Sequence, residues 1–152
     1  MAALSDELRC FNLVQAEIQG LYHEACLKLG LSDSASKILY MLAAFGEGCT
    51  QRDICRHFGL SRQTVHSSIR ILSAQAVILL QKDSGRVRRI FLTEKGRMLI
   101  RERIEPLINM ENELLESWSD GERSSLLGLL RKYRDDLRER VATLQAWKDD
   151  VQ

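Results

Sequence analysis

The sequence has little of what secreted, membrane-bound or metal-centred proteins need. No apolar run approaches the ~18 residues that cross a bilayer, and residues 1–9 carry acids where a secretory signal has its basic start. The four cysteines lack the close spacing of a disulfide framework, so we expect thiols in a reducing cytoplasm. The three histidines are scattered and form no close ligand pair with a cysteine. We therefore expect a cytoplasmic protein without a membrane span, a metal site or a cofactor.

Catalytic signatures are also missing. The sequence has no phosphate-binding loop, no nucleophile motif and no zinc-binding helix motif. It has a single proline, Pro106, and contains no repeats, low-complexity stretches or interdomain linker. Enzymatic activity is therefore not expected, and the 152 residues are enough for one compact domain.

Positive charge, by contrast, is concentrated in the middle of the chain. The net charge of +1 conceals an uneven distribution. Residues 50–101 contain 11 Lys and Arg and 3 Asp and Glu, a net charge of +8, whereas the rest of the chain contains 11 Lys and Arg and 18 Asp and Glu, a net charge of −7. A basic segment on an otherwise acidic scaffold is typical of proteins that bind the phosphates of nucleic acid. Chance clustering on a solvated face is the alternative that charge alone leaves open.

Apolar spacing and capping residues predict a mainly α-helical fold with a small β-hairpin. The expected elements, in chain order, are helices over residues 5–29, 32–45, 50–58 and 61–76, strands over 77–81 and 87–92, a helix over 94–118 and a last helix capped at 119. Pro106 should kink or restart the helix that contains it. Ser119 and Glu122 have the spacing of a capping box at the start of the last helix.

The expected third and fourth helices form a helix-turn-helix arrangement, because a tight turn containing Gly59 joins them. The apolar face of the fourth helix consists of Val65, Ile69, Leu72 and Ala76. Its opposite face carries Arg62, Gln63, His66, Ser67 and Arg70. Arginine can bind guanine with two hydrogen bonds and glutamine can bind adenine. The polar face therefore predicts base reading in the major groove.

Two further features favour an anionic partner. Residues 61–82 contain no Asp or Glu, whereas a solvated helix face usually mixes acids and bases. The hairpin adds Lys82, Arg86, Arg88 and Arg89. Arg86, at the turn, is best placed to enter a minor groove, while Arg88 and Arg89 could instead protect an edge strand from pairing with another chain. The predicted DNA-binding residues are Thr50, Gln51, Ser61, Arg62, Gln63, Thr64, His66, Ser67, Arg70, Arg86 and Arg88.

At these segments the chain resembles the MarR family (multiple antibiotic resistance regulators) of bacterial winged helix-turn-helix transcriptional regulators. The matching segments are residues 50–54, 59–65, 92–96 (Leu-Thr-Glu-Lys-Gly) and 118–122. The resemblance implies a winged helix-turn-helix over residues 32–100 and dimerisation helices over 1–31 and 101–152. It also implies a homodimer that binds a pseudo-palindromic operator, with half-sites about one helical turn apart. We expect a repressor that a small molecule releases from double-stranded DNA.

The resemblance further implies a small aromatic effector, bound between the dimer helices and the winged region. Tyr22, His23, Tyr40 and Met41 are the candidate pocket residues, and an ordinary core role for each is the alternative. A subset of the family senses peroxides through a cysteine early in the first helix, where Cys10 lies. A cysteine on a helix is more often a small buried hydrophobe. A redox-sensing regulator and a winged-helix protein-interaction module that does not bind DNA stay open as alternatives.

Overall fold

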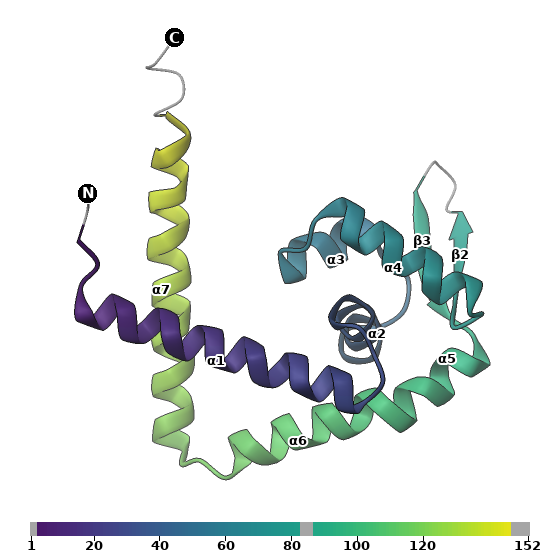
Figure 1. Ribbon diagram of the computed structural model, residues 1–152, viewed down its shortest axis with the longest axis horizontal. Helices are drawn as coiled ribbons and strands as arrows, with labels where there is room; N and C mark the ends of the chain where they lie inside the picture. The colour runs from purple at the N-terminus through teal and green to yellow at the C-terminus, as the bar shows by residue number, and fades with distance from the viewer. Residues whose placement is uncertain (1–2, 83–86, 147–152) are drawn as a thin grey trace. The chain divides into compact units, whose positions relative to one another are not determined.

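Helices make up most of the computed structural model, which describes residues 3–82 and 87–146 (Figure 1). The elements are α1 (Asp6–Lys28), α2 (Asp33–Phe45), β1 (Cys49–Thr50), α3 (Gln51–Phe58), α4 (Arg62–Ala74), β2 (Ile78–Lys82), β3 (Arg88–Leu92), α5 (Glu94–Leu99), the π-helical segment η1 (Ile100–Ile104), α6 (Glu105–Glu116) and α7 (Asp120–Ala146). The chain forms two compact units, Met1–Ile108 and Asn109–Gln152. The mainly α-helical winged fold expected from the sequence is confirmed.

Side-chain caps place the helix starts where the sequence predicts them. The Ser5 hydroxyl accepts a hydrogen bond from Leu8 N at 3.2 Å, and the Ser32 hydroxyl accepts one from Ala35 N at 3.3 Å. At α3, Thr50 Oγ1 accepts from Asp53 N, and the Asp53 carboxylate accepts from Thr50 N at 2.9 Å, which completes a capping box. Each cap satisfies backbone N–H groups that have no partner inside the helix.

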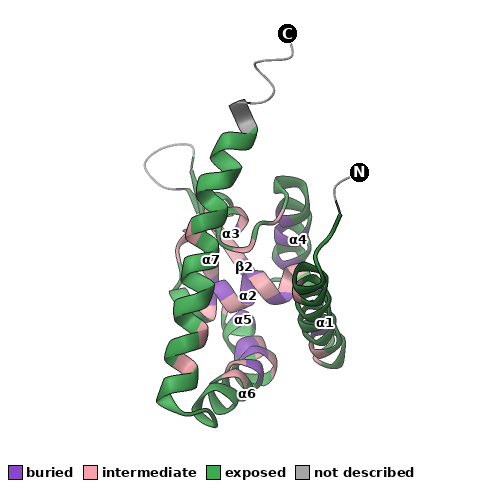
Figure 2. Cartoon of the chain, turned by 90° about the vertical axis from the view of Figure 1, so that its left-hand side faces the viewer, coloured by how far each residue is buried: buried purple, intermediate pink, exposed green. Residues whose placement is uncertain are grey.

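The core of the first unit surrounds α2, which Figure 1 shows end-on beside α3 and α4 and which also packs against η1. Figure 2 shows the buried residues gathered around this helix. The fully or almost fully buried side chains include Ile38, Leu39, Ile54, Val65, Ile78, Ile90 and Ile104. Burying each such side chain stabilises the fold by about 1.5–3 kcal/mol. This packing holds the helix-turn-helix and the sheet in one body.

The predicted packing face of α4 is confirmed in three of its four positions. Val65, Ile69 and Leu72 are buried, whereas Ala76 is exposed. Helix α4 ends at Ala74, two residues earlier than expected, and Ala76 adopts the left-handed conformation with φ of 54°. Ala76 therefore turns the chain from α4 into β2, and the expectation that it packs on the helix face is wrong.

The predicted hairpin is part of an antiparallel sheet, whose strands within the described residues follow the order β1-β3-β2. Leu80 pairs with Ile90 and Lys82 pairs with Arg88 across β2 and β3. Strand β1, in which Thr50 pairs with Arg89, was not expected from the sequence. A strand of two residues has no alternation to detect, and Thr50 also caps α3.

The Leu-Thr-Glu-Lys-Gly segment joins the sheet to α5. The Thr93 hydroxyl donates to Ala76 O at 2.7 Å and accepts from Gly96 N at 3.0 Å. A side chain on Gly96 would collide with the backbone carbonyl of Val77. Glycine at this position therefore lets α5 pack directly against the start of β2, which explains why this short pattern identifies the junction so well.

Pro106 does not restart the helix that contains it, since α5, η1 and α6 follow one another without interruption. The helix instead widens into η1 just before the proline, and Glu105 N bonds to Ile100 O, five residues back. Proline has no N–H and its ring collides with the carbonyl four residues earlier in an α-helix, so a wider turn accommodates it. Within η1, Arg103 Nη1 donates to Leu29 O at 3.0 Å and to Gly30 O at 3.2 Å, which ties η1 to the end of α1.

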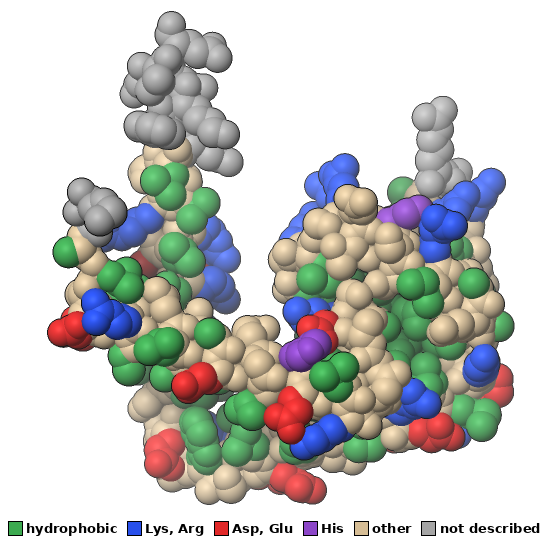
Figure 3. Space-filling view, in the orientation of Figure 1, with side chains coloured by type: hydrophobic (Ala, Val, Ile, Leu, Met, Phe, Trp, Pro, Cys, Tyr) green, Lys and Arg blue, Asp and Glu red, His purple; other side chains and the backbone are tan. Residues whose placement is uncertain are grey.

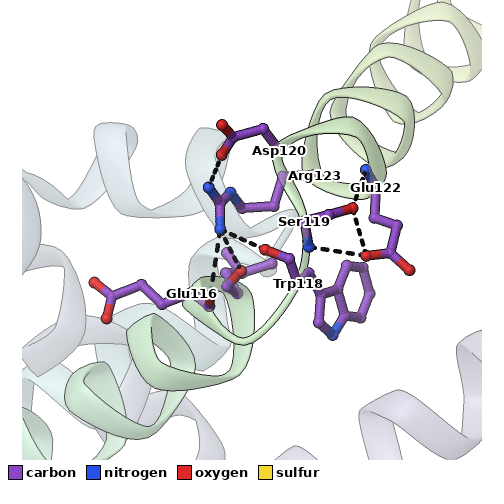
Figure 4. A network of polar contacts seen from close by, with 7 residues as sticks. Glu116, Trp118, Ser119, Asp120, Glu122 and Arg123 are labelled. Atoms are coloured by element: carbon purple, nitrogen blue, oxygen red, sulfur yellow. Dashed lines mark hydrogen bonds and ion pairs between the residues drawn. The ribbon is translucent and has the colours of Figure 1, made fainter.

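The second unit contains the corner between α6 and α7 (Figure 4). The predicted capping box is present, since Ser119 N donates to the Glu122 carboxylate at 2.8 Å and Glu122 N donates to Ser119 Oγ at 3.3 Å. Arg123 Nη1 donates to the carbonyls of Leu115 at 3.2 Å and Trp118 at 2.7 Å, and Arg123 pairs with Asp120. One guanidinium thus satisfies carbonyls at the end of α6 that have no partner within the helix.

Both long helices leave apolar side chains exposed. Only Cys26 is buried in α1, and within the described part of α7 no side chain is buried. The exposed apolar residues of α1 include Val14, Ile18 and Leu21, and those of α7 include Leu130, Tyr133, Leu137, Val141 and Leu144. Their spacing of three and four places each set on one helix face.

Candidate nucleic-acid interface

Three contacts hold α4, the predicted recognition helix, in place. Gly59, with φ of 64°, makes the tight turn that brings α4 back against α3. Gln51 Nε2 donates to Arg62 O at 2.8 Å and so links the start of α3 to the start of α4. Ser68 is buried on α4, and its hydroxyl bonds to the Ser34 hydroxyl of α2 at 2.7 Å. The helix is therefore positioned from two neighbouring helices before any ligand arrives.

The polar face of α4 is exposed as the sequence predicts. Arg62, Gln63, His66, Ser67 and Arg70 are all exposed. At the start of the helix the hydroxyls of Ser61 and Thr64 lie 2.8 Å apart, and the Ser61 hydroxyl also accepts from Thr64 N at 3.0 Å. One hydroxyl proton of this pair is used between the two side chains, and the other stays available for a phosphate oxygen.

An open groove of about 850 Å³ separates α4 from the sheet. Its lining includes five of the predicted DNA-binding residues, namely Gln51, His66, Ser67, Arg70 and Arg88. The apolar residues Ile69, Leu80 and Ile90 also line it. We call this feature the α4–sheet groove. Figure 3 shows Lys and Arg side chains along the upper edge of the winged region, over its helices and hairpin, whereas the acidic side chains lie lower.

Strand alternation predicts that Arg88 and Arg89 of β3 point to opposite faces of the sheet, and Arg89 is absent from the lining of the α4–sheet groove. Arg88 lines the α4–sheet groove and pairs with Lys82 across the strands. Like charges directly opposite each other destabilise a strand pair, so an anion beside this pair would relieve a local repulsion. Arg89 instead donates Nη1 to Gly48 O at 3.0 Å. Arg86 lies outside the described residues.

A second hollow of about 590 Å³ lies between the start of α3 and β3. We call it the arginine pocket, because Arg52, Arg56, Arg88 and Arg89 line it together with Thr50 and Asp53. Hydrogen bonds from the Thr50 side chain and backbone, with the charges of Arg56 and Arg89, hold the pKa of Asp53 below its ordinary value. Arg52 and Arg56 are not among the DNA-binding residues predicted from the sequence. Their spacing of four residues, which places both on one face of α3, could have indicated a shared site.

The four candidate effector residues lie in different environments. Tyr22 and His23 are exposed on α1, and His23 Nδ1 lies 2.8 Å from the Asp33 carboxylate of α2. Tyr40 is half-buried against the core, and Met41 is part of it. Neither the α4–sheet groove nor the arginine pocket contains any of the four. The environment of Met41 agrees with an ordinary core role for that residue.

The described cysteines are all free thiols in contrasting environments. Cys10 is exposed on α1, Cys26 is buried, and Cys49 and Cys55 are half-buried. Burial, with a smaller contribution from the Asp53 charge, raises the pKa of the Cys49 thiol to about 11. Cys49 is therefore protonated and unreactive at neutral pH, whereas exposure leaves Cys10 accessible.

Two absences among the described residues bear on other functional classes. No helix there has both the length and the apolar character needed to cross a membrane. No group of three or more His, Cys, Asp or Glu side chains in the same residues is arranged to hold a metal ion.

Comparison with known proteins shows which family part of this chain resembles. Residues 29–90 match the model of the MarR family. No curated protein matches the sequence significantly. Solved structures with a similar fold include NMB1585, a MarR family regulator from Neisseria meningitidis, with 21% identity over 91% of this chain and 98% of that chain and a TM-score of 0.81.

Two other similar structures have comparable coverage. A MarR/EmrR family transcriptional regulator from Acinetobacter sp. ADP1 has 22% identity over 89% of this chain and 99% of that chain, with a TM-score of 0.74. The S. aureus MepR–DNA complex has 21% identity over 88% and 97%, with a TM-score of 0.70. At these identities the likeness establishes a common fold along almost the whole length of each chain.

Proposed function

We propose that the chain is a transcriptional regulator of the MarR family, whose model its residues 29–90 match, and that it binds duplex DNA through α4 and the neighbouring sheet. The observation that carries this proposal is the α4–sheet groove, which brings together Gln51, His66, Ser67, Arg70 and Arg88 from separate elements. No acid interrupts residues 61–82, so this surface attracts phosphates along its length. The similar MepR structure was solved as a complex with DNA.

The residues of this surface divide by chemistry into two roles. Arg62, Gln63 and Arg70 project from the exposed face of α4 and have the donors and acceptors that read base edges. Ser61 and Thr64 lie at the start of α4, where backbone N–H groups and hydroxyls suit phosphate oxygens. We assign Thr50, at the start of α3, to the phosphates of the same DNA strand. We assign Arg86 to the minor groove because of its position at the predicted hairpin turn.

We further propose that the protein acts as a homodimer, with residues 32–100 binding DNA and residues 1–31 and 101–152 forming the dimer interface. The support is the exposed apolar face on each long helix, such as Leu130, Leu137 and Leu144 on α7. Burying one such side chain contributes about 1.5–3 kcal/mol, whereas association costs about 4–15 kcal/mol. Several such residues on each protomer therefore favour association. Two-fold symmetry would then match a pseudo-palindromic operator.

Repression and effector release complete the proposal. A dimer bound at a promoter excludes other proteins from the same DNA, so repression in the cytoplasm is its simplest consequence. A small aromatic compound bound near Tyr22 and His23 would act where α1 contacts α2 through the His23–Asp33 pair. Asp33 and Ser34 are neighbours at the start of α2, and Ser34 bonds to Ser68 of α4. A ligand that moved α1 would therefore act one residue away from a contact of the recognition helix.

The deciding experiment titrates the full-length protein against DNA from upstream of its own gene, at low and moderate salt, with unrelated DNA as competitor. We expect specific binding of two protomers per site that weakens steeply as salt rises. A folded protein that binds neither this DNA nor any sequence from a genome-wide selection would overturn the proposal. The protein-interaction module without DNA binding would then be the better description.

A further inference from the structure

The arginine pocket carries more positive charge than the structure of α3 accounts for. Among its described lining residues, four arginines face one carboxylate, that of Asp53. Asp53 already accepts hydrogen bonds from Thr50 N at 2.9 Å and Thr50 Oγ1 at 2.7 Å. Its carboxylate is therefore committed to capping α3, and the pocket keeps a net positive charge.

The position of Arg52 is locally unfavourable. Arg52 lies in the first turn of α3, where the helix dipole repels a positive charge. Arg56 lies four residues later on the same face, in the last turn, where the dipole favours it, but the two guanidinium groups repel each other. Both side chains are exposed. A local arrangement that destabilises the helix without a structural gain is typical of a functional site.

The arginine pocket adjoins the α4–sheet groove. Gln51 and Arg88 line both hollows and form the ridge between them. Arg89 supplies the far wall from β3, where its bond to Gly48 O at 3.0 Å orients the guanidinium. Guanidinium groups from α3 and β3 thus converge from two rigid elements. Such an arrangement suits a compact anion.

We propose that the arginine pocket binds a phosphate group, which Arg52, Arg56 and Arg89 contact through their guanidinium donors. The planar guanidinium matches phosphate oxygens with two parallel hydrogen bonds, and three such groups can surround one tetrahedral anion. The phosphate belongs either to the DNA backbone beside the α4–sheet groove or to a phosphorylated small molecule. In the first case the inference rests on the proposed function, and in the second it stands without it.

The test compares two doubly substituted full-length proteins that lose the same charge. R52Q/R56Q removes the pocket arginines, whereas R131Q/R140Q removes two exposed arginines of α7. Each is titrated with the upstream DNA duplex over a range of salt. For a backbone phosphate, we expect the slope of log affinity against log salt to fall by about two units in R52Q/R56Q, with unchanged sequence preference and no fall in R131Q/R140Q.

A second arm omits DNA and titrates the same proteins with inorganic phosphate by calorimetry. For a phosphorylated small molecule, we expect wild type and R131Q/R140Q to bind phosphate and R52Q/R56Q not to bind it, with equal salt slopes on DNA. R52K/R56K keeps the charge and loses the guanidinium fork, so it should retain the salt slope but bind phosphate or DNA more weakly. Thermal melting verifies that each variant is folded.

The outcomes separate this inference from the proposed function. If Arg70→Ala weakens DNA binding while R52Q/R56Q matches wild type in both arms, the phosphate site is overturned and the regulator stands. If the wild type binds phosphate but no DNA, and R52Q/R56Q does not bind phosphate, the phosphate site stands and the regulator fails. A protein that binds neither DNA nor phosphate contradicts both.

Discussion

Ser34 of α2 and Ser68 of α4 share a hydrogen bond of 2.7 Å between their hydroxyls, and Ser68 is 7% exposed on a helix whose other buried residues are apolar. A buried hydroxyl is costly unless it is bonded. This pair therefore specifies the rotation of α4 about its axis, because turning the helix would leave both hydroxyls without their partner.

Neighbouring serines on α4 should separate stability from DNA binding. We predict that Ser68→Ala lowers the free energy of unfolding by about 0.5–1.5 kcal/mol, because it removes a part-buried hydrogen bond. The adjacent exposed Ser67→Ala should leave stability within about 0.5 kcal/mol and weaken DNA binding instead. Chemical denaturation and DNA titration of both variants test this. Equal stability losses in the two variants would contradict the assigned packing role of Ser68.

Arginines of α4 should determine affinity and sequence preference together. Arg62→Ala and Arg70→Ala are each expected to weaken operator binding by about 10- to 100-fold and to relax the preference at the base pair concerned. Arg86→Ala should weaken binding with a smaller change in preference. Binding titrations against the operator and singly mutated duplexes measure both effects. Full-strength, fully specific binding by all three variants would refute the assignment of α4 as the recognition helix.

The apolar face of α7 should control the oligomeric state. Leu137→Asp places a charge on that face and is expected to convert a dimer into a monomer with weaker DNA binding, because a buried unpaired charge is costly. Ala142→Asp adds the same charge on the far side of the helix and serves as the control. Sedimentation velocity distinguishes the two. A stable dimer in the Leu137→Asp variant would remove α7 from the interface.

A fragment of the chain tests whether dimerisation depends on the terminal helices. The isolated segment of residues 50–101 should be monomeric and bind DNA poorly, since it lacks the long helices with exposed apolar faces. A tight dimer of this fragment in sedimentation would count against the terminal helices as the interface.

Cysteine reactivity should follow exposure and the pKa of each thiol. At about pH 8, alkylation is expected at Cys10 and not at Cys49, because the Cys49 pKa of about 11 leaves almost no thiolate. Reaction at Cys49 should rise only as the pH approaches that pKa. Mass spectrometry of peptides after brief alkylation reports both sites. A redox-sensing role would additionally require peroxide to weaken DNA binding in wild type and not in Cys10→Ser.

The corner between α6 and α7 should depend on a single guanidinium. Arg123→Lys keeps the charge but cannot reach the carbonyls of Leu115 and Trp118 together with the Asp120 carboxylate. We expect faster hydrogen exchange of the backbone amides at the start of α7 in this variant. Arg131→Lys, elsewhere on α7, should leave that exchange unchanged. Equal exchange in the two variants would mean that the Ser119–Glu122 capping box holds the corner without Arg123.

Local chemistry allowed most elements to be predicted from the sequence. Ser5, Ser32, Thr50, Ser61 and Thr93 cap the helices that follow them, because a cap depends on neighbours three residues away. Spacing along α4 predicted the burial of Val65, Ile69 and Leu72 for the same reason. The composition of residues 61–82, free of acids, was enough to indicate an anionic partner.

Contacts between distant segments decided what the sequence could not. Cys49 and Thr50 form a strand because they pair with β3. Helix α4 ends before Ala76 because that residue adopts a positive φ, which turns the chain into β2. The arginine pocket likewise exists only because the fold brings β3, more than thirty residues later in the chain, beside the first turn of α3. Helix caps and faces are properties of adjacent residues and can be read from order alone. The arginine pocket and the short strand β1 depend on which distant segment of the chain lies beside them. Only the packing around α2 determines that.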